Sequence, residues 1–432
     1  MSVGLQRLRE EPDLLRQGAI DKGEDPAVID RAVGLDERRR GLLAEGDGLK
    51  AERNASSKRI GEAIRGGADP AGPEVAELKA ASTRVGERIA AIDAELAGIE
   101  ADLNDALLRI PNPADPDVPV GGEEANVTVR TWGEPLPREH RRPHWELAEE
   151  LGIIDLARGA KVSGSGFPIY VGAGSALQRA LINWFLDVHT AEHGMTELWP
   201  PAVVNAASAT GTGQIPDKED QMYAVTRDEL YLVPTAEVPV TNMHRDEILE
   251  ASALPIRYAA YSPSFRREAG AAGRDTRGIL RVHQFDKVEM VSFVAPGESE
   301  RELEWLTKRA EVLLQRLGLA YRVVLMSTRE MGFVQARKYD LEVWAPGAKR
   351  WLEVSSVSNF RDYQARRMAI RHRPEAGARP ELLHTLNGSG LALPRTVAAL
   401  LETHQQPDGS ILVPEPLRPY LRGRERLGPG RA

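Results

Sequence analysis

The most regular hydrophobic pattern of the chain lies in its first quarter. Residues 27–65 contain no proline, and leucines recur there every seven residues, at Leu35, Leu42 and Leu49. After the break GGADPAGP at 66–73, residues 74–108 carry apolar side chains at alternating spacings of four and three: Val85, Ile89, Ile92, Leu96, Ile99 and Leu103. This spacing is typical of a coiled-coil seam. The sequence predicts a short capping helix within residues 1–26, then an antiparallel pair of helices roughly 50 Å long.

Beyond this hairpin the pattern changes to mixed strands and helices. The stretch IPNPADPDVPVGG at 110–122 has four prolines and is predicted to be a linker. Residues 175–195 form an amphipathic helix, and TELWPPAVV at 196–204 is predicted as a strand whose prolines favour a sheet edge. The segments SFRRE at 264–268 and ILRVHQFDKVEMVSFV at 279–294 alternate like strands, which predicts an antiparallel β-hairpin around an exposed loop at 269–278.

Composition narrows the class of protein. A chain of 432 residues exceeds one ordinary core, so two or three domains are expected. With 42% hydrophobic and 28% charged residues, the composition is that of a soluble globular protein. No apolar run approaches the ~20 residues that span a bilayer, and the N-terminus lacks the apolar core of a signal peptide. The absence of cysteine excludes disulfides, and we expect a cytoplasmic protein.

Charge is unevenly distributed along the helical hairpin, although the net charge of −8 argues against a general nucleic-acid coat. Residues 37–66 hold eight basic and five acidic side chains, whereas residues 91–105 hold only acidic ones. A basic tip on an acidic stem suits an arm that binds a phosphate backbone. A pair of oligomerisation helices is the alternative. The candidate RNA contacts are Arg38, Arg39, Lys50, Arg53, Lys58 and Arg59.

The predicted β-hairpin has an unusually polar floor. Alternation along a strand places Arg266 and Glu268 on one face, and Phe285, Lys287 and Glu289 on one face of the second strand. A guanidinium grips phosphate or carboxylate with a planar fork, and an aromatic ring stacks on a base. The loop adds Arg274, Arg277 and Arg281. By themselves these residues also fit a surface hairpin with paired charges.

The full stretch from Phe265 to Glu289, FRREAGAAGRDTRGILRVHQFDKVE, resembles motif 2 of the class II aminoacyl-tRNA synthetases, in the version of the seryl-tRNA synthetase family. By this resemblance Arg266, Arg267 and Glu268 bind ATP, through its phosphates and the adenine edge. Phe285 stacks on adenine beside the backbone near Val282. Glu289 binds serine, and Arg266 contacts serine as well as ATP.

Further stretches resemble the same family in the expected order. The helix and strand at 175–204 are similar to motif 1, which builds the dimer interface. The Gly-rich loop GTGQIPDKED at 211–220 lacks the Lys-Ser/Thr ending of a P-loop and is similar to the family's mobile cover over the site. The TAE stretch of Thr235, Ala236 and Glu237 is similar to the family's serine pocket.

The C-terminal third contains the remaining residues that the resemblance implies as contacts of ATP, Mg²⁺ and serine. The strand WLEVSS contains the implied ATP contacts Glu353, Val354, Ser355 and Ser356, with Glu353 and Ser356 as ligands of an ATP-bound Mg²⁺. The stretch LNGSGLALPRTVAALLE at 386–402 resembles motif 3. In that motif the arginine matching Arg395 grips the γ-phosphate, and Asn387 and Ser389 belong to the serine pocket.

The resemblance implies an α+β fold, an antiparallel sheet flanked by helices with an N-terminal coiled-coil arm. The implied domains are an arm at 1–110, a linker at 111–122 and a catalytic domain at 123–432. It implies a homodimeric serine–tRNA ligase, not membrane-bound, that makes seryl-adenylate from L-serine and ATP. The serine passes to the acceptor end of tRNA(Ser), held by its long variable arm, and in the family also to tRNA(Sec). Catalysis would rest on positioning and on charge stabilisation by Arg266, Glu268, Arg395 and Mg²⁺.

Two other classes of protein stay open. A ligase that loads an amino acid onto a carrier protein would keep the ATP motifs but not a complete arm. A catalytically silent tRNA-binding paralogue would keep the arm but would be expected to lose Arg266, Glu268 or Arg395, and all three are present.

Overall fold

The helical hairpin and the strands belong to separate compact units. The structure, a computed structural model, describes residues 3–137, 139, 141–269 and 277–428. The chain divides into one unit of Met1–Ile20 and Glu24–Pro111 and a second of Asp21–Gly23 and Asn112–Ala432. Among the described residues, no helix combines the length and the apolar character needed to cross a bilayer.

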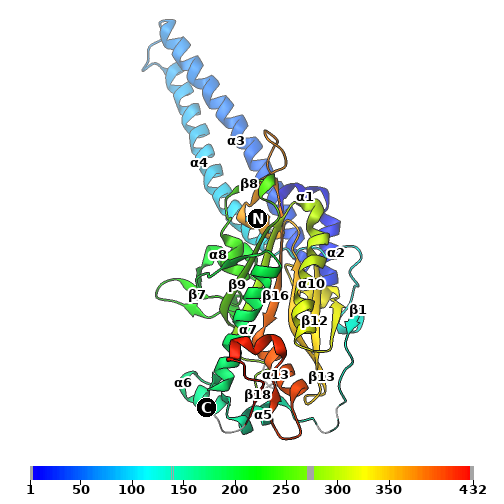
Figure 1. Cartoon of the computed structure of the whole chain (residues 1–432). Helices are drawn as coiled ribbons and strands as arrows, with labels where there is room; N and C mark the ends of the chain where they lie inside the picture. The colour runs from blue at the N-terminus through cyan, green and yellow to red at the C-terminus, as the bar shows by residue number, and fades with distance from the viewer. Residues whose placement is uncertain (1–2, 138, 140, 270–276, 429–432) are drawn as a thin grey trace. The chain divides into compact units, whose positions relative to one another are not determined.

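Two long helices, α3 (Ala27–Arg65) and α4 (Pro73–Leu108), form the predicted hairpin and lie side by side (Figure 1). The short helices α1 (Leu5–Glu10) and α2 (Pro12–Lys22) precede them. In the seam Leu42, Ile92 and Ile99 are buried, flanked by Leu35, Leu49 and Leu96. Both predicted helices and their contact are confirmed, because an a/d repeat specifies the helix and its buried stripe together.

A second apolar cluster holds the base of the hairpin. Ile29 of α3 and Leu107 of α4 are fully buried there against Leu8 and Leu15. Beside it the buried carboxylate of Asp36 accepts two hydrogen bonds from the Arg9 guanidinium, both of 2.7 Å, and one from Arg40. These charge-assisted hydrogen bonds lower the pKa of Asp36. The base therefore has its own core, distinct from the seam of the arm.

An eight-stranded sheet organises the second unit. Its strand order is β1-β11-β12-β13-β16-β10-β9-β4, antiparallel throughout except for the pair β4 and β9. The strands are β1 (Val127–Trp132), β11 (Tyr321–Leu325), β12 (Arg337–Ala345), β13 (Arg350–Asn359), β16 (His384–Ala392), β10 (Gln284–Val294), β9 (Ile256–Phe265) and β4 (Thr196–Leu198). Strands β10, β16 and β13 lie at the centre, so their side chains are positioned by neighbours on both sides.

Three long helices pack on this sheet and complete the main core (Figure 1). They are α7 (Ala173–Asp187), α10 (Ser299–Arg316) and α13 (Leu393–His404). The buried residues Phe185, Leu313 and Leu400, one from each helix, belong to the same apolar cluster as Val288 and Leu341 of the sheet. The expectation of an antiparallel sheet flanked by helices is confirmed.

The predicted motif-1 strand is shorter than expected. It divides into β4 and β5 (Val203–Asn205), with Trp199, Pro200 and Pro201 between them. A proline lacks the N–H that a ladder needs, so pairing stops there. β4 does form the predicted sheet edge, and Trp199 is 76% exposed beside it.

The predicted strands of the motif-2 hairpin also end earlier. β9 stops at Phe265 and β10 begins at Gln284, so Arg266 and Glu268 lie beyond the ladder rather than on a strand face. Glu268 has a φ of +51°, a left-handed conformation that no strand residue adopts. The shared face of Phe285, Lys287 and Glu289 on β10 is confirmed. Arg274 of the loop lies outside the described residues.

Shorter elements connect this framework. They are α5 (His144–Leu151), β2 (Ile154–Asp155), α6 (Leu156–Ser163), β3 (Ile169–Tyr170), a π-helical turn (Val188–Glu192), α8 (Ala206–Thr212), β6 (Ala224–Val225), β7 (Leu230–Leu232), α9 (Glu237–Asn242), β8 (Ile248–Glu250), α11 (Thr328–Met331), α12 (Tyr363–Met368), β14 (Arg371–Arg373), β15 (Glu381–Leu382), β17 (Ile411–Leu412) and β18 (Arg426–Leu427). Single 3₁₀ turns occupy Glu123–Ala125, Glu219–Gln221, Ala251–Ala253, Pro296–Glu298, Glu415–Leu417 and Pro419–Leu421.

Candidate active site

A polar pocket of about 560 Å³ lies over the central strands of the second unit. Seven basic and five acidic side chains line it, an excess of positive charge that suits an anionic ligand. The predicted site residues that line the pocket are Thr235, Glu237, Arg266, Glu268, Val282, Phe285, Glu289, Glu353, Val354, Ser356, Asn387, Ser389 and Arg395. Residues more than 150 positions apart in the sequence thus contribute to one cavity.

Three predicted residues do not line this pocket. Ala236 is fully buried in a neighbouring apolar cluster. The Ser355 hydroxyl donates to the Ser389 carbonyl oxygen at 2.6 Å and so supports the pocket wall from behind. The Arg267 guanidinium donates to the Asp220 carbonyl oxygen at 3.0 Å. The roles of these three as ligand contacts stay predictions.

The motif-2 residues form one end of the site. The Arg266 guanidinium carbon lies 5.1 Å from the centre of the Phe285 ring, a cation–π contact. Glu268, which follows the end of β9, forms an ion pair with Arg281, which precedes β10. This ion pair connects the two ends of the loop. This end presents a guanidinium and an aromatic face together, a combination that can bind the phosphate and the base of a nucleotide.

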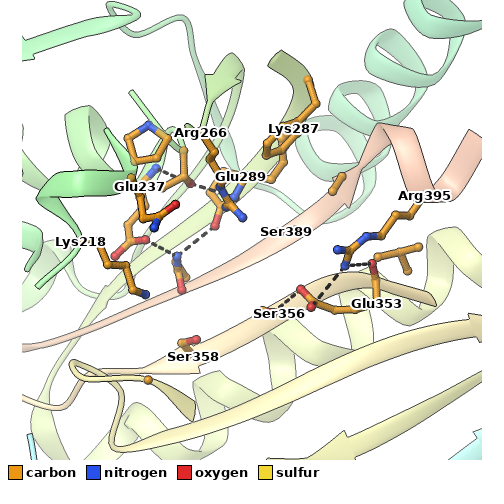
Figure 2. Close-up of a pocket in the computed structure, with 18 of the residues that line it drawn as sticks. Lys218, Glu237, Arg266, Lys287, Glu289, Glu353, Ser356, Ser358, Ser389 and Arg395 are labelled. Atoms are coloured by element: carbon orange, nitrogen blue, oxygen red, sulfur yellow. Dashed lines mark hydrogen bonds and ion pairs between the residues drawn. The ribbon is translucent and has the colours of Figure 1, made fainter. Parts of the chain in front are cut away.

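A second group of side chains gathers around Glu237 and Glu289 (Figure 2). The Asn387 amide nitrogen donates to both carboxylates, at 2.9 Å to Glu237 and 3.0 Å to Glu289. Lys287 forms an ion pair with Glu289 and donates to the Thr235 hydroxyl at 2.8 Å. All five side chains are buried. Acceptors of this kind, fixed by partners, can recognise a small ligand with an amine and a hydroxyl.

The two carboxylates of this group have different electrostatic surroundings. Burial, and next the negative charge of Glu289, raise the pKa of Glu237 to about 7. The Gln364 side-chain amide opposes the shift by donating to Glu237 at 2.6 Å. Glu289 has Lys287 as a direct ionic partner. The charge of Glu237 therefore changes near neutral pH.

The third group joins Arg395 to Glu353 and Ser356 (Figure 2). Arg395 lies in the first turn of α13. Its guanidinium donates to the Glu353 carbonyl oxygen at 3.0 Å and to the Glu353 carboxylate at 3.4 Å. Partial burial opposes the charge of Glu353, but Arg395 and then Lys338 outweigh this effect and lower its pKa.

A β-bulge explains why Glu353 and Ser356 share a face. Regular alternation would point residues three apart to opposite sides of a strand. In the pairing of β12 with β13, Leu341 faces Ser355 but Glu342 faces Glu353, so Val354 is an extra residue. The Ser356 hydroxyl can then donate to the Glu353 carboxylate at 2.9 Å.

These two oxygen donors fit a hard divalent cation. An ionised carboxylate and a hydroxyl are ligands that Mg²⁺ accepts. Within the described part of the chain, no group of three His, Cys, Asp or Glu side chains has the geometry to hold a metal ion by itself. A cation at Glu353 and Ser356 would therefore take its other ligands from a phosphate-bearing substrate and water.

Lys287 is the main residue that the sequence interpretation did not assign to the site. The alternation of Phe285, Lys287 and Glu289 on one strand face was the available signal, because it places the lysine between two predicted ligand contacts. Lys218 also lines the pocket, from the Gly-rich loop at 211–220. Lysines are common on any surface, so neither position stood out without the pocket.

The basic residues of the arm divide into two sets. Arg38 donates to Glu95 and Arg39 to Glu100, both across the hairpin to α4. Lys58 is 3.9 Å from Glu62, a loose ion pair. Lys50, Arg53 and Arg59 are exposed and form no ion pair with any described residue. The unpaired charges thus lie further along α3 than Arg38 and Arg39.

Two family models match the chain, one after the other. Residues 4–114 match the seryl-tRNA synthetase N-terminal domain, and residues 223–404 match the tRNA synthetase class II core domain (G, H, P, S and T). The first match covers the helical hairpin, and the second covers the pocket-lining residues from Pro234 to Arg395.

Whole-chain relatives are close in sequence and structure. The serine–tRNA ligase of Thermomicrobium roseum is 55% identical over 99% of this chain and 95% of its own length. That of Geobacter sulfurreducens is 49% identical over 98% and 99%. The solved seryl-tRNA synthetase from Pyrococcus horikoshii complexed with ATP superposes with a TM-score of 0.92 at 37% identity, over 99% of this chain and 100% of that one. From this agreement over both units, the chain belongs to the seryl-tRNA synthetase family of class II aminoacyl-tRNA synthetases.

Proposed function

We propose that this chain is a serine–tRNA ligase that activates L-serine with ATP and transfers it to tRNA. The observation that carries this proposal is the composition of one pocket. It joins a nucleotide end, with Arg266 and Phe285, to a group of buried acceptors around Glu237 and Glu289. Relatives with the printed name serine–tRNA ligase, matched along their whole length, support the same activity.

Activation would proceed by direct displacement. An oxygen of the serine carboxylate attacks the α-phosphorus of ATP, the bond from that phosphorus to the bridging oxygen breaks, and pyrophosphate leaves. Arg266 would neutralise charge at the α-phosphate, and Arg395 would bind the departing end. A divalent ion held at Glu353 and Ser356 would supply further charge neutralisation. No side chain has to act as a nucleophile, so the rate would depend on alignment and electrostatic stabilisation.

Serine selection would rest on the group around Glu289. We propose that Glu289, Thr235 and Ser389 hold the amine and hydroxyl, with Glu237 and Asn387 behind them. The ion pair with Lys287 keeps the Glu289 carboxylate in a fixed position. A buried acceptor left without its hydroxyl partner is costly, so an amino acid that lacks the hydroxyl should bind the transition state poorly.

We further propose that the helical hairpin binds the long variable arm of tRNA(Ser) and that two copies of the chain assemble through the motif-1 region. The dimer proposal is supported by the exposed Trp199 beside the edge strand β4. A homodimer acting in the cytoplasm with Mg²⁺ and ATP, and charging tRNA(Sec) as well, completes the proposal.

Serine-dependent exchange of pyrophosphate into ATP, measured with each of the twenty amino acids, tests the activity. We expect serine to dominate and alanine to be weaker by as much as ~10⁴-fold. Equal activation of alanine or threonine would contradict the serine assignment. Transfer to tRNA but not to an acyl-carrier protein separates the ligase from a carrier-loading enzyme, and any exchange at all excludes a silent tRNA-binding paralogue.

A further inference from the structure

His144, the first residue of α5, does not line the pocket, yet it is hydrogen-bonded to Glu402 of α13 and to Ile279, and both segments contribute other residues to the pocket wall. Its side chain and that of Glu402, near the end of α13, are both fully buried. A buried histidine and carboxylate are costly unless every polar atom has a partner. The partners of this pair therefore indicate its role.

Every polar atom of the pair is used. The Glu402 carboxylate accepts from His144 Nδ1 at 2.8 Å, from the His144 backbone N–H at 2.9 Å and from the Ala348 backbone N–H at 2.9 Å. The other ring nitrogen, His144 Nε2, accepts from the backbone N–H of Ile279 at 3.3 Å. An accepting Nε2 carries no proton, so Nδ1 is the protonated nitrogen that donates to Glu402.

Ile279 lies where the motif-2 loop returns to the sheet. The next residue, Leu280, accepts a hydrogen bond from Arg395 Nε at 3.2 Å through its carbonyl oxygen. The residue after that, Arg281, forms the ion pair with Glu268. Arg395 and Glu402 both belong to α13, seven residues and about two turns apart. The contacts therefore run from α13 through His144 to residues 279–281 and back to α13 through Arg395. They lie on the nucleotide side of the pocket.

Gly278 shows how closely the ring approaches the loop. A Cβ at this position would lie 2.2 Å from His144 Nε2, and its φ of +69° also favours glycine. The contact thus depends on the absence of a side chain at residue 278.

We propose that His144 is a positioning residue for adenylate formation. By accepting from Ile279 while held by Glu402, it fixes residues 278–281 so that Leu280 orients Arg395 and Arg281 holds Glu268. The inference rests on the proposed function, since the residues that it positions are the proposed ATP contacts. It predicts that substitution of His144 changes the KM for ATP rather than the KM for serine.

Two conservative variants separate the two sides of the imidazole. In His144→Asn the amide nitrogen can replace Nδ1 and keep the bond to Glu402. In His144→Gln the amide oxygen can replace Nε2 and keep the bond from Ile279. In pyrophosphate exchange we expect His144→Ala and His144→Asn to raise the KM for ATP about tenfold with an unchanged KM for serine, and His144→Gln to recover most of the loss.

A purely structural role predicts a different result. All three variants would then lower the melting temperature without changing either KM, and this outcome, or a parallel rise in both KM values, would overturn the inference. Gly278→Ala provides a second route if the His144 variants do not fold, because it disturbs the same contact and keeps the histidine. A selective rise in the KM for ATP there supports the inference, and unchanged kinetics overturn it.

The failure of the proposed function would look different. In that case the unmodified chain would show no serine-dependent exchange. The same variants would then be compared by calorimetric titration with ATP, where weaker binding by His144→Asn than by His144→Gln still supports the positioning role and equal binding overturns it.

Discussion

At the scale of single residues, the active site depends on how each charge is partnered. Arg266 lines the pocket and lies over the Phe285 ring, whereas its neighbour Arg267 donates to the Asp220 carbonyl oxygen. The carboxylates Glu237 and Glu289 share Asn387, but of the two only Glu289 is paired with Lys287. Substitutions of adjacent or chemically similar residues are therefore expected to change the activity by different amounts.

The two neighbouring arginines provide a matched comparison. Arg266→Ala should reduce serine-dependent pyrophosphate exchange by at least ~10²-fold, because it removes a charged contact from a preformed pocket. Arg267→Ala should cost much less, since its guanidinium bonds outside the pocket. Circular dichroism should show both variants folded. Near-normal exchange by Arg266→Ala would contradict the assignment of motif 2.

The raised pKa of Glu237 predicts how serine binding depends on pH. With a pKa of about 7, this carboxyl is mostly protonated at about pH 6 and mostly ionised at about pH 8. Ionised Glu237 adds negative charge behind Glu289, the proposed contact of the serine ammonium, so the KM for serine should fall as the pH rises through this range. Glu237→Gln should have a flatter profile. A profile that is equally steep in the variant would show that another group titrates.

At the scale of elements, regular strands and helices position most of the site residues, and one β-bulge positions the rest. The bulge at Val354 brings Glu353 and Ser356 to one face of β13, and the start of α13 directly after β16 places Arg395 against them. The arm is simpler, because Arg38 and Arg39 of α3 pair with carboxylates of α4, whereas Lys50, Arg53 and Arg59 further along α3 form no ion pair with any described residue.

This division of charge predicts which arm residues bind RNA. Replacing Lys50, Arg53 and Arg59 together by alanine should weaken tRNA binding and reduce the slope of log affinity against log salt by about two to three. The double variant Arg38→Ala and Arg39→Ala should change the slope less, because these arginines are bonded to Glu95 and Glu100. Binding measured by filter retention over a range of salt concentrations would distinguish the two sets, and an equal effect would contradict the division.

At the scale of the whole molecule, we expect the two compact units to have separable tasks. The residues that line the pocket all lie in the second unit, and the arm has its own apolar seam. The base cluster around Ile29 and Leu107, with the Arg9–Asp36 pair, is distinct from that seam. The arm can therefore be shortened without removing the base.

Deletion of residues 42–94, with a short Gly/Ser linker, should spare serine activation and cripple transfer to tRNA. The deletion keeps Asp36 and the base cluster, so loss of folding is not expected. Pyrophosphate exchange and aminoacylation would be measured on the same preparation. Aminoacylation at the full rate would show that the arm is structural and that our proposal for it is wrong.

The sequence by itself determined the features that depend on local order. The helices at 27–65 and 73–108 follow from apolar periodicity and the Gly/Pro-rich break, both of which act within a few turns. The motif residues of the pocket were also predictable, but through the family resemblance of the stretch that contains Arg266, Phe285 and Glu289. The face shared by Phe285 and Glu289 needed only the alternation of a strand.

The tertiary structure decided what depends on partners distant in the sequence. Strand β9 ends at Phe265 because pairing with β10 ends there, and alternation within SFRRE carries no sign of this limit. The bulge at Val354 is a property of two strands together. His144 and Glu402 meet across 258 positions, so their contact could not be recognised from the sequence around either residue. The raised pKa of Glu237 likewise requires burial beside Glu289, and burial exists only once the chain has folded.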